Sequence, residues 1–283
     1  MSPSNLASVA VTNLASELSA NSPARHDTPN DAITRLELVS QVLETEAGRD
    51  RSAKPFPKLS IVIPVYNEHK SIEQVIANVR KLDIHKQIIV VDDGSTDGTR
   101  EILASLPITS DVEIFFHAVN QGKGAALQTG FRLAEGEIVI VQDADLEYNP
   151  EDILSVIDPI VRGESSVAFG SRYLQNQHQN SSFVHRFGNW ALTAFSNLMN
   201  RQRLTDMETC YKAFRREILS QLTIEQRRFG FEPEITAKLA RLGLSIPEVP
   251  VRYNARSWTE GKKIGLRDLI SALYCIVRYR WFA

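Results

Sequence analysis

Apolar runs and helical hydrophobic patterns alternate through the middle of this chain. Leu59–Pro64 has the length of a buried strand, and a stripe with helical spacing follows it. The stripe consists of Ile72, Val75, Ile76, Val79 and Leu82. Further strands are predicted at Gln87–Asp92, Val112–His117, Glu137–Asp143 and Ser166–Gly170, separated by helices that end near Ser105, span Gly122–Ala134 and begin at Glu151. Such alternation favours βαβ units, so we predict an α/β fold with a mostly parallel sheet flanked by helices.

Polar motifs follow the carboxyl ends of four of these strands. They are Val65–Glu68, Asp93–Thr99, Asp143–Glu147 and Ser171–Tyr173. Because parallel strands end at the same edge of a sheet, we expect these motifs to meet in one crevice.

Asp143 and Asp145 are two carboxylates separated by one residue, directly after an apolar run. A hard divalent cation prefers oxygen ligands and commonly shares them with substrate phosphates. The motif therefore indicates a site for Mg²⁺ or Mn²⁺ and a diphosphate. An Asp pair after a strand can also simply cap the next helix. The convergence of four polar motifs favours the metal site.

Beyond Tyr173 the alternation ends. An amphipathic helix is predicted from Phe183 to Leu198, and its aromatic residues are expected to lie in the core rather than against a cofactor. Its apolar stripe consists of Phe183, Phe187, Trp190, Ala191, Ala194, Phe195 and Leu198. A strand at Cys210–Arg215, a helix at Pro233–Leu242 and an edge strand at Ile246–Tyr253, which contains two prolines, complete the expected body.

Three parts of the chain are expected. Residues 1–57 would form an extension that begins with a disordered tail, continues in a short helix at Asp31–Ala47 and ends in a linker. Residues 58–264 would be the folded domain, and residues 265–283 an amphipathic helix that ends in aromatic and basic residues. This helix suits either a membrane interface or packing against the body, and its pattern does not choose between them.

Composition excludes several classes. The net charge of −2 provides no basic footprint for nucleic acid. The two cysteines, Cys210 and Cys275, lie far apart and suggest neither a disulfide framework nor a metal motif, which favours a reducing compartment. No apolar run reaches the roughly 18 residues of a membrane span. We therefore expect a cytoplasmic protein that at most contacts the inner face of a membrane.

In their order along the chain, the motifs resemble those of family 2 glycosyltransferases, and most of all the dolichol-phosphate mannosyltransferase type. The resemblance extends from about Leu59 to Arg280. It rests on Pro64–Glu68, Val91–Thr99, Asn120–Gly124, Asp143–Leu146 and Gly170–Tyr173. It implies a GT-A fold and transfer of a sugar from a nucleotide-diphospho-sugar, GDP- or UDP-linked, to polyprenyl phosphate.

The same resemblance implies roles for individual residues. Tyr66 would lie against the base and Glu68 near its polar edge or the ribose. The donor-binding set would consist of Pro64, Tyr66, Glu68, Val90, Asp92, Asp93, Lys123, Asp143, Ala144, Arg256 and Lys262. Lys123 would lie near the nucleotide or be merely solvated. Asp143, Asp145 and Glu147 would bind the metal, with Glu147 standing where relatives often carry Gln.

The cations indicate a phosphorylated acceptor. Arg172, Arg186, Arg256, Lys262 and Lys263 exceed what one metal-bound diphosphate requires. A phosphate oxygen is already anionic and needs no general base, so Asp145, Arg172 and Arg186 would act by positioning and charge stabilisation, with inversion at the anomeric carbon.

Two alternatives remain. A glycan or other hydroxyl acceptor would require a carboxylate base, for which Asp206 or Glu208 could serve. A non-catalytic nucleotide-sugar-binding protein would use the same crevice without turnover.

Overall fold

The computed structural model describes residues 58–107, 109–174, 183–228, 230–256 and 266–282. The strands are β1 (Leu59–Val65), β2 (Lys86–Asp92), β3 (Val112–Phe116), β4 (Ile138–Val141), β5 (Val167–Ser171), β6 (Lys212–Arg215) and β7 (Glu248–Pro250). The helices are α3 (Ile72–Arg80), α4 (Thr99–Ser105), α5 (Lys123–Leu133), α6 (Asp152–Val161), α7 (Phe183–Asn200), α8 (Arg216–Leu219), α9 (Phe231–Arg241) and α10 (Leu266–Trp281).

The seven strands form one mixed sheet in the order β3-β2-β1-β4-β6-β5-β7. β1 pairs in parallel with β2 and β4, and Ile61 lies opposite Ile88 on one side and Ile140 on the other. β6 runs antiparallel to both of its neighbours, β4 and β5. The predicted α/β class with a mostly parallel sheet is confirmed. Because β6 is reversed, the residues that precede it lie at the edge where β4 and β5 end.

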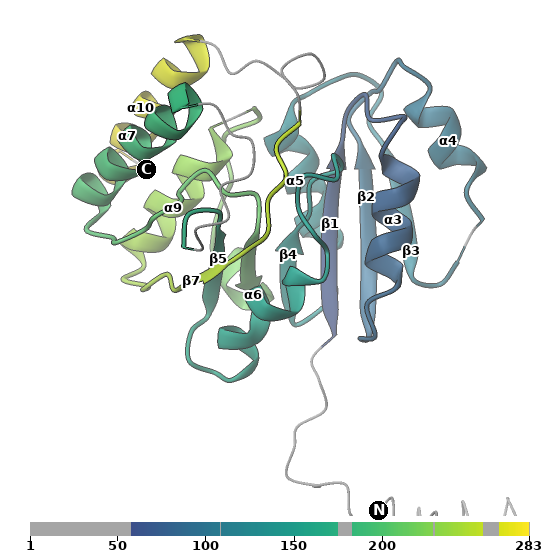
Figure 1. Cartoon of the computed structure of the whole chain (residues 1–283), viewed down its shortest axis with the longest axis horizontal. Helices are drawn as coiled ribbons and strands as arrows, with labels where there is room; N and C mark the ends of the chain where they lie inside the picture. Colours follow the sequence, from purple (N-terminus) through teal and green to yellow (C-terminus); the bar gives the residue numbers. More distant parts are fainter. Residues whose placement is uncertain (1–57, 108, 175–182, 229, 257–265, 283) are drawn as a thin grey trace, which may run out of the picture. The chain divides into compact units, whose positions relative to one another are not determined.

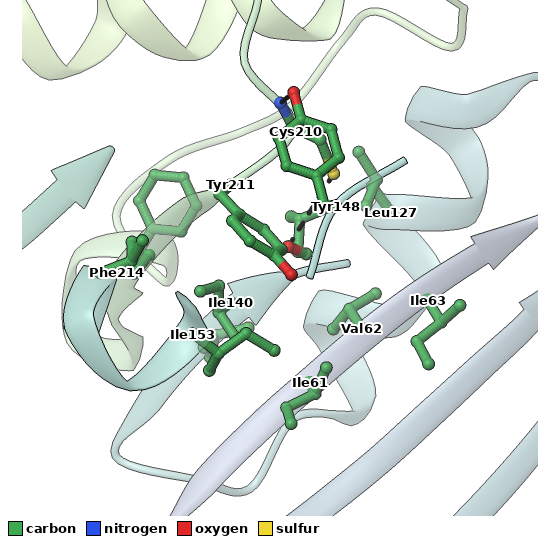
Figure 2. Close-up of a cluster of buried hydrophobic side chains, with 14 of the residues drawn as sticks. Ile61, Val62, Ile63, Leu127, Ile140, Tyr148, Ile153, Cys210, Tyr211 and Phe214 are labelled. Atoms are coloured by element: carbon green, nitrogen blue, oxygen red, sulfur yellow. Dashed lines mark hydrogen bonds between the residues drawn. The ribbon is translucent and has the colours of Figure 1, made fainter. Parts of the chain in front are cut away.

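Helices cover both faces of the sheet. α3 and α6 lie over one face and α5 over the other (Figure 1). All seven residues of β1 are buried, as expected for a central strand covered on both sides. Figure 2 shows the middle of this core, where Ile153 of α6 lies near Ile140 of β4 and Ile61 of β1.

The expectation that the aromatic residues of the helix after Tyr173 lie in the core is wrong for Phe187 and Trp190. Their side chains are 58% and 63% exposed, whereas Leu192, Thr193 and Ser196 are buried. The inward face of the helix, which carries Leu192, Thr193 and Ser196, packs in the part of the structure where α7 contacts α9 and α10. Phe187 and Trp190 lie on the opposite, exposed side.

The C-terminal helix α10 packs against α9 and α7, beside the β5–β7 end of the sheet (Figure 1). Ala272, Cys275, Ile276 and Tyr279 are buried in this contact. Its other face is also apolar, with Ile270, Tyr274, Trp281 and Phe282 exposed. One face of the helix thus packs on the folded body, and the other face is exposed.

The predicted edge strand near residue 250 is confirmed but is shorter than expected. β7 pairs only with β5, in parallel, and spans three residues that end at Pro250. The extension at residues 1–57, including the helix expected at Asp31–Ala47, and the basic residues Lys262 and Lys263 lie outside the described residues. The division into three parts stays a prediction. Within the described part of the chain, no helix is both long and apolar enough to cross a membrane.

The contact between α5 and β1 has no room for a side chain at Gly130. A Cβ atom there would clash with Cγ1 of the buried Val62. Gly130→Ala is therefore expected to lower the free energy of unfolding by about 1–3 kcal/mol through overpacking, despite the better helix propensity of alanine.

Gly188, within α7, is the matched control, because a Cβ there would meet nothing within 4 Å. Gly188→Ala should stabilise the protein by up to about 1 kcal/mol. Urea denaturation followed by circular dichroism measures both variants. Equal effects of the two substitutions would contradict the packing described for α5.

Candidate active site

The polar motifs converge as expected at one edge of the sheet. Tyr66 follows β1, Asp93 follows β2, Asp143 follows β4 and Arg172 follows β5, and all four strands run in the same direction. The segment 205–211 reaches the same edge because it precedes the reversed strand β6. The sheet thus assembles side chains from five separate parts of the sequence.

Several of the residues that are expected to bind the nucleotide are buried. Pro64, Val90 and Asp92 are buried, whereas the Tyr66 ring is 42% exposed. The Asp92 carboxylate accepts hydrogen bonds from the backbone N–H of Ser95 and faces the Arg100 guanidinium at 3.5 Å. These contacts fix the turn after β2.

Asp93 holds the next loop in place. Its carboxylate accepts hydrogen bonds from the backbone N–H groups of Gln121 (3.0 Å) and Gly122 (2.7 Å) and contacts Nδ1 of His117 at 2.8 Å. The structure therefore places Asp93 as the anchor of the loop that leads into Lys123.

Asp143 and Asp145 both lie at this edge of the sheet and are partly exposed. Their side chains are 22% and 23% exposed, whereas Ala144 between them is buried and its carbonyl accepts a hydrogen bond from Ser71 Oγ at 2.7 Å. Leu146, the residue after Asp145, has a positive φ of 60°, which turns the chain sharply after the second carboxylate. Two carboxylates displayed in this way match the oxygen ligands that Mg²⁺ and Mn²⁺ prefer.

Lys123 is the first residue of α5 and is bound on two sides. Its Nζ lies 3.0 Å from Oδ1 of Asp143 and 3.2 Å from Oε1 of Glu232. Burial alone would lower the pKa of this lysine, but Asp143 and Glu232 outweigh it and hold the pKa well above its ordinary value. Lys123 is thus part of the site and is not merely solvated.

The glycines around Lys123 allow this contact. A Cβ at Gly124 would clash with the backbone carbonyl of Gln226, and the Arg227 carbonyl accepts a hydrogen bond from the Ala125 N–H at 3.1 Å. The 226–228 loop therefore closes directly on the start of α5. This brings Glu232, in the first turn of α9, against Lys123.

Glu147 is bound to the segment that follows β7. Its carboxylate accepts a hydrogen bond from the Tyr253 hydroxyl at 2.8 Å and another from the Arg256 backbone N–H at 3.0 Å. Burial, and then Glu147, raise the pKa of Tyr253. The third carboxylate of the motif thus holds the segment that carries Arg256.

Arg256 reaches across the crevice. Its guanidinium lies 2.9 Å from Glu68 and 3.6 Å from the Asp145 carboxylate, and its Nε donates to the Asp145 carbonyl at 3.0 Å. The structure therefore joins the exits of β1 and β4 through one arginine. Among the described side chains, no group of three or more His, Cys, Asp or Glu is arranged around a common metal position.

Arg172 is paired with Asp206 at the other end of the crevice. Nε and Nη2 of the guanidinium donate to the two carboxylate oxygens at 2.6 and 2.7 Å. Although burial opposes it, Asp206 holds the pKa of Arg172 well above its ordinary value. Asn189 of α7 also donates to Asp206, at 3.2 Å, whereas Arg186 of the same helix is exposed and faces Tyr173 electrostatically.

Glu232 was missed by reasoning from sequence, and Asp206 and Glu208 were named only as bases for a hydroxyl acceptor. The signal available for Glu232 was the Phe-Glu-Pro-Glu start of a helix, since proline and acidic residues are typical of a first helical turn. That pattern reports a helix end and not an active site. Lys262 lies outside the described residues.

Comparison with known proteins agrees with this geometry. Residues 60–223 match the family model described as glycosyl transferase family 2. The undecaprenyl-phosphate mannosyltransferase of Micrococcus luteus is 30% identical over 72% of this chain and 86% of that protein. The polyprenol monophosphomannose synthase of Mycolicibacterium smegmatis is 28% identical over 78% of this chain and 87% of that protein.

A solved structure shares the fold. Glucosyl-3-phosphoglycerate synthase from Mycobacterium tuberculosis, crystallised with Mn²⁺ and UDP-glucose, superposes with a TM-score of 0.60. The aligned region covers 85% of this chain and 81% of the synthase chain, at 21% sequence identity. The likeness confirms the predicted GT-A fold.

The Arg172–Asp206 pair predicts a stability effect. Asp206→Ala would leave a mostly buried guanidinium without its carboxylate, and we expect a loss of about 3–5 kcal/mol in the free energy of unfolding. Asp158, whose pair with Arg162 on α6 is exposed, is the control, and Asp158→Ala should cost no more than about 0.5 kcal/mol. Chemical denaturation of both variants measures the difference, and a small effect at Asp206 would show that Arg172 does not depend on it.

Proposed function

The chain belongs to glycosyl transferase family 2 and is a glycosyltransferase, and on this premise we propose its donor, acceptor and mechanism. It transfers a sugar from a nucleotide-diphospho-sugar to polyprenyl phosphate, requires Mg²⁺ or Mn²⁺, and inverts the anomeric carbon. The observation that carries the proposal is the placement of Asp143 and Asp145 at the same edge of the sheet as Arg172.

The donor's diphosphate binds on the Asp143 side. Asp143 and Asp145 would hold the metal, and Glu147, whose carboxylate oxygens bind Tyr253 and the Arg256 N–H, would hold the segment that carries Arg256 beside it. The metal would neutralise the charge that develops on the leaving diphosphate. Lys123 adds a positive charge beside Asp143, and Arg256 lies between this position and Glu68, where the nucleotide would bind.

The acceptor phosphate binds on the Arg172 side. Asp206 engages two N–H groups of the guanidinium and Tyr253 interacts with it as well, but the Arg172 side chain is still 17% exposed and can face a phosphate. Arg186 on α7, which interacts electrostatically with Tyr173, would add charge around the same anion. The names of the two relatives, a polyprenol monophosphomannose synthase and an undecaprenyl-phosphate mannosyltransferase, support this acceptor class.

The chemistry requires few steps from the protein. The acceptor phosphate oxygen attacks the anomeric carbon while the bond from that carbon to the donor's diphosphate breaks. The attacking oxygen is anionic near neutral pH, so no proton has to be removed. Side chains from β4 and β5 hold the two reactants on opposite sides of the sugar, which lowers the barrier by positioning and produces inversion.

An apolar surface supports contact with a membrane, where a polyprenyl chain resides. Phe187 and Trp190 on α7 are exposed and their ring centroids are 5.7 Å apart, while Trp281 and Phe282 are exposed at the end of α10. The two helices contact each other (Figure 1). Exposed aromatic side chains of this kind suit the interfacial region of a bilayer. We place the protein peripherally, at the inner face of the membrane.

A direct test mixes the protein, Mg²⁺ or Mn²⁺, polyprenyl phosphate and labelled UDP- or GDP-sugars, and measures label extracted into organic solvent. Asp145→Asn removes a metal-binding charge and is expected to reduce the metal-dependent label at least about 100-fold. Asp158→Asn on α6 is the control and should retain full activity. No metal-dependent label in the organic phase, although the labelled donor is bound or consumed, would reject the phosphate acceptor.

The surface contact has its own test. The double variant Phe187→Ser, Trp190→Ser should bind vesicles of anionic phospholipid at least about tenfold more weakly, because each ring loses roughly 1.5–3 kcal/mol of apolar burial. Leu154→Ser removes an exposed apolar side chain from α6 and serves as the control. Flotation of the full chain with the vesicles measures both, and equal loss in the two variants would contradict a defined membrane face.

A further inference from the structure

Several buried oxygen atoms near the crevice make no hydrogen bond with any described residue. They are Oδ1 of Asn189, Oε1 of Glu208, Oγ1 of Thr209 and Oε2 of Glu232. A buried polar atom without a partner is rare in folded proteins and calls for a specific explanation. Two of these atoms belong to carboxylates, which when ionised can only accept hydrogen bonds.

Glu208 lies in a turn whose backbone is held by hydrogen bonds from Lys212. The Lys212 ammonium donates to the carbonyls of Met207 (2.7 Å) and Thr209 (2.6 Å), the two neighbours of Glu208. Lys212 is fully buried, with its Nζ 4.4 Å from the centre of the Phe169 ring. The lysine therefore fixes the backbone on both sides of Glu208 and makes no hydrogen bond to its side chain.

No hydrogen bond to the Glu208 carboxylate occurs within the described part of the structure. Burial raises the pKa of this carboxyl, and the neighbouring Glu232 raises it further, against the opposite influence of Lys212. The protein thus maintains an acid whose buried Oε1 has no hydrogen-bond donor among the described residues.

Only one of the two carboxylate oxygens of Glu232 has a partner among the described residues. Its Oε1 lies 3.2 Å from Lys123, which in turn lies 3.0 Å from Asp143, while its Oε2 has no partner. The side chain is 5% exposed and belongs to the first turn of α9. One ammonium group therefore separates Glu232 from the metal-binding side of the crevice.

Contacts and sequence neighbours connect both acids with the two ends of the proposed reaction. Glu232 is linked to Asp143 through Lys123, and Cys210, two residues after Glu208, interacts with the Asp143 carboxyl. Asp206, two residues before Glu208, binds Arg172. The transferred sugar must bridge the donor's diphosphate and the acceptor phosphate, and these acids belong to the segments that connect the residues proposed to bind the two groups.

We propose that the carboxylates of Glu208 and Glu232 form the sugar-binding subsite, where they accept hydrogen bonds from hydroxyl groups of the donor's sugar. The proposal rests on the proposed function and names the residues that select the sugar. Sugar hydroxyls supply the donors that these carboxylate oxygens lack, and such charge-assisted bonds are the strong ones. A subsite built on hydroxyl recognition discriminates strongly against sugars that lack the hydroxyl.

The first experiment uses Glu208→Gln. With Mn²⁺ present, calorimetry compares binding of UDP and GDP with binding of UDP- and GDP-linked hexoses. The substitution should weaken binding of the accepted nucleotide-sugar about 10- to 100-fold, the usual effect of one hydrogen bond to a charged group, and leave the free nucleotide unchanged. Glu232→Gln should also weaken binding of the nucleotide-sugar. The glutamine side chain can still accept a hydrogen bond from Lys123, so that contact is retained. Glu217→Gln, on the exposed side of α8, is the control and should change neither.

A second readout needs no ligand. Because the unpartnered Glu208 carboxylate is costly in the free protein, Glu208→Gln should raise the melting temperature, as expected where stability is sacrificed for function. A lower melting temperature would mean that Glu208 has a structural role and would overturn the proposal.

Two other outcomes are also decisive. Unchanged nucleotide-sugar affinity with a lost turnover would make Glu208 a general base for a hydroxyl acceptor and overturn the proposal. Normal sugar selectivity of the variants together with label on polyprenyl phosphate would overturn the subsite alone. A wild-type protein that binds hexose nucleotides through Glu208 but never labels polyprenyl phosphate would keep the subsite and reject the acceptor.

Discussion

The reversed direction of β6 is the constraint on which the candidate site depends. β1, β2, β4 and β5 end at one edge of the sheet and would by themselves bring Tyr66, Asp93, Asp143 and Arg172 together. Since β6 runs the other way between β4 and β5, the turn that precedes it is placed at the same edge. Asp206 and Glu208 thereby enter a crevice that parallel strands alone would not have given them.

Charge pairing maintains this crowded edge. Lys123 lies between Asp143 and Glu232, Arg172 is held by Asp206, and Arg256 joins Glu68 to the Asp145 segment. A buried charge is tolerated when an opposite charge with good geometry faces it. Glu208 differs, because the buried Lys212 ammonium donates its hydrogen bonds to the carbonyls of Met207 and Thr209 and not to the Glu208 carboxylate. An acid kept without a hydrogen-bond donor is a reason to look for a ligand that supplies one.

In the proposed mechanism, the two ends of this edge of the sheet bind different substrates. One end carries the carboxylates that suit a metal and a diphosphate, and the other carries an arginine suited to a phosphate. The apolar faces of α7 and α10 lie on helices packed beside the β5–β7 end of the sheet (Figure 1). Arg186 belongs to the same helix as the exposed Phe187 and Trp190, so one helix connects the proposed acceptor site with the proposed membrane face.

The sequence alone determined the α/β class, the positions of the main elements and the convergence of motifs at strand ends, because hydrophobic periodicity and strand direction are local or nearly local properties. It also predicted that Asp143, Asp145 and Arg172 belong to one site, and the structure brings all three to one edge of the sheet. It did not show which face of α7 is buried, since the stripe containing Phe187 and Trp190 is equally consistent with a core or a surface until its neighbours are known. Glu232 and the pairing of Glu147 with Tyr253 were decided only by the tertiary structure, because residues far apart in the chain come together there through the closure of the 226–228 loop on α5 and of the segment after β7 on the exit of β4.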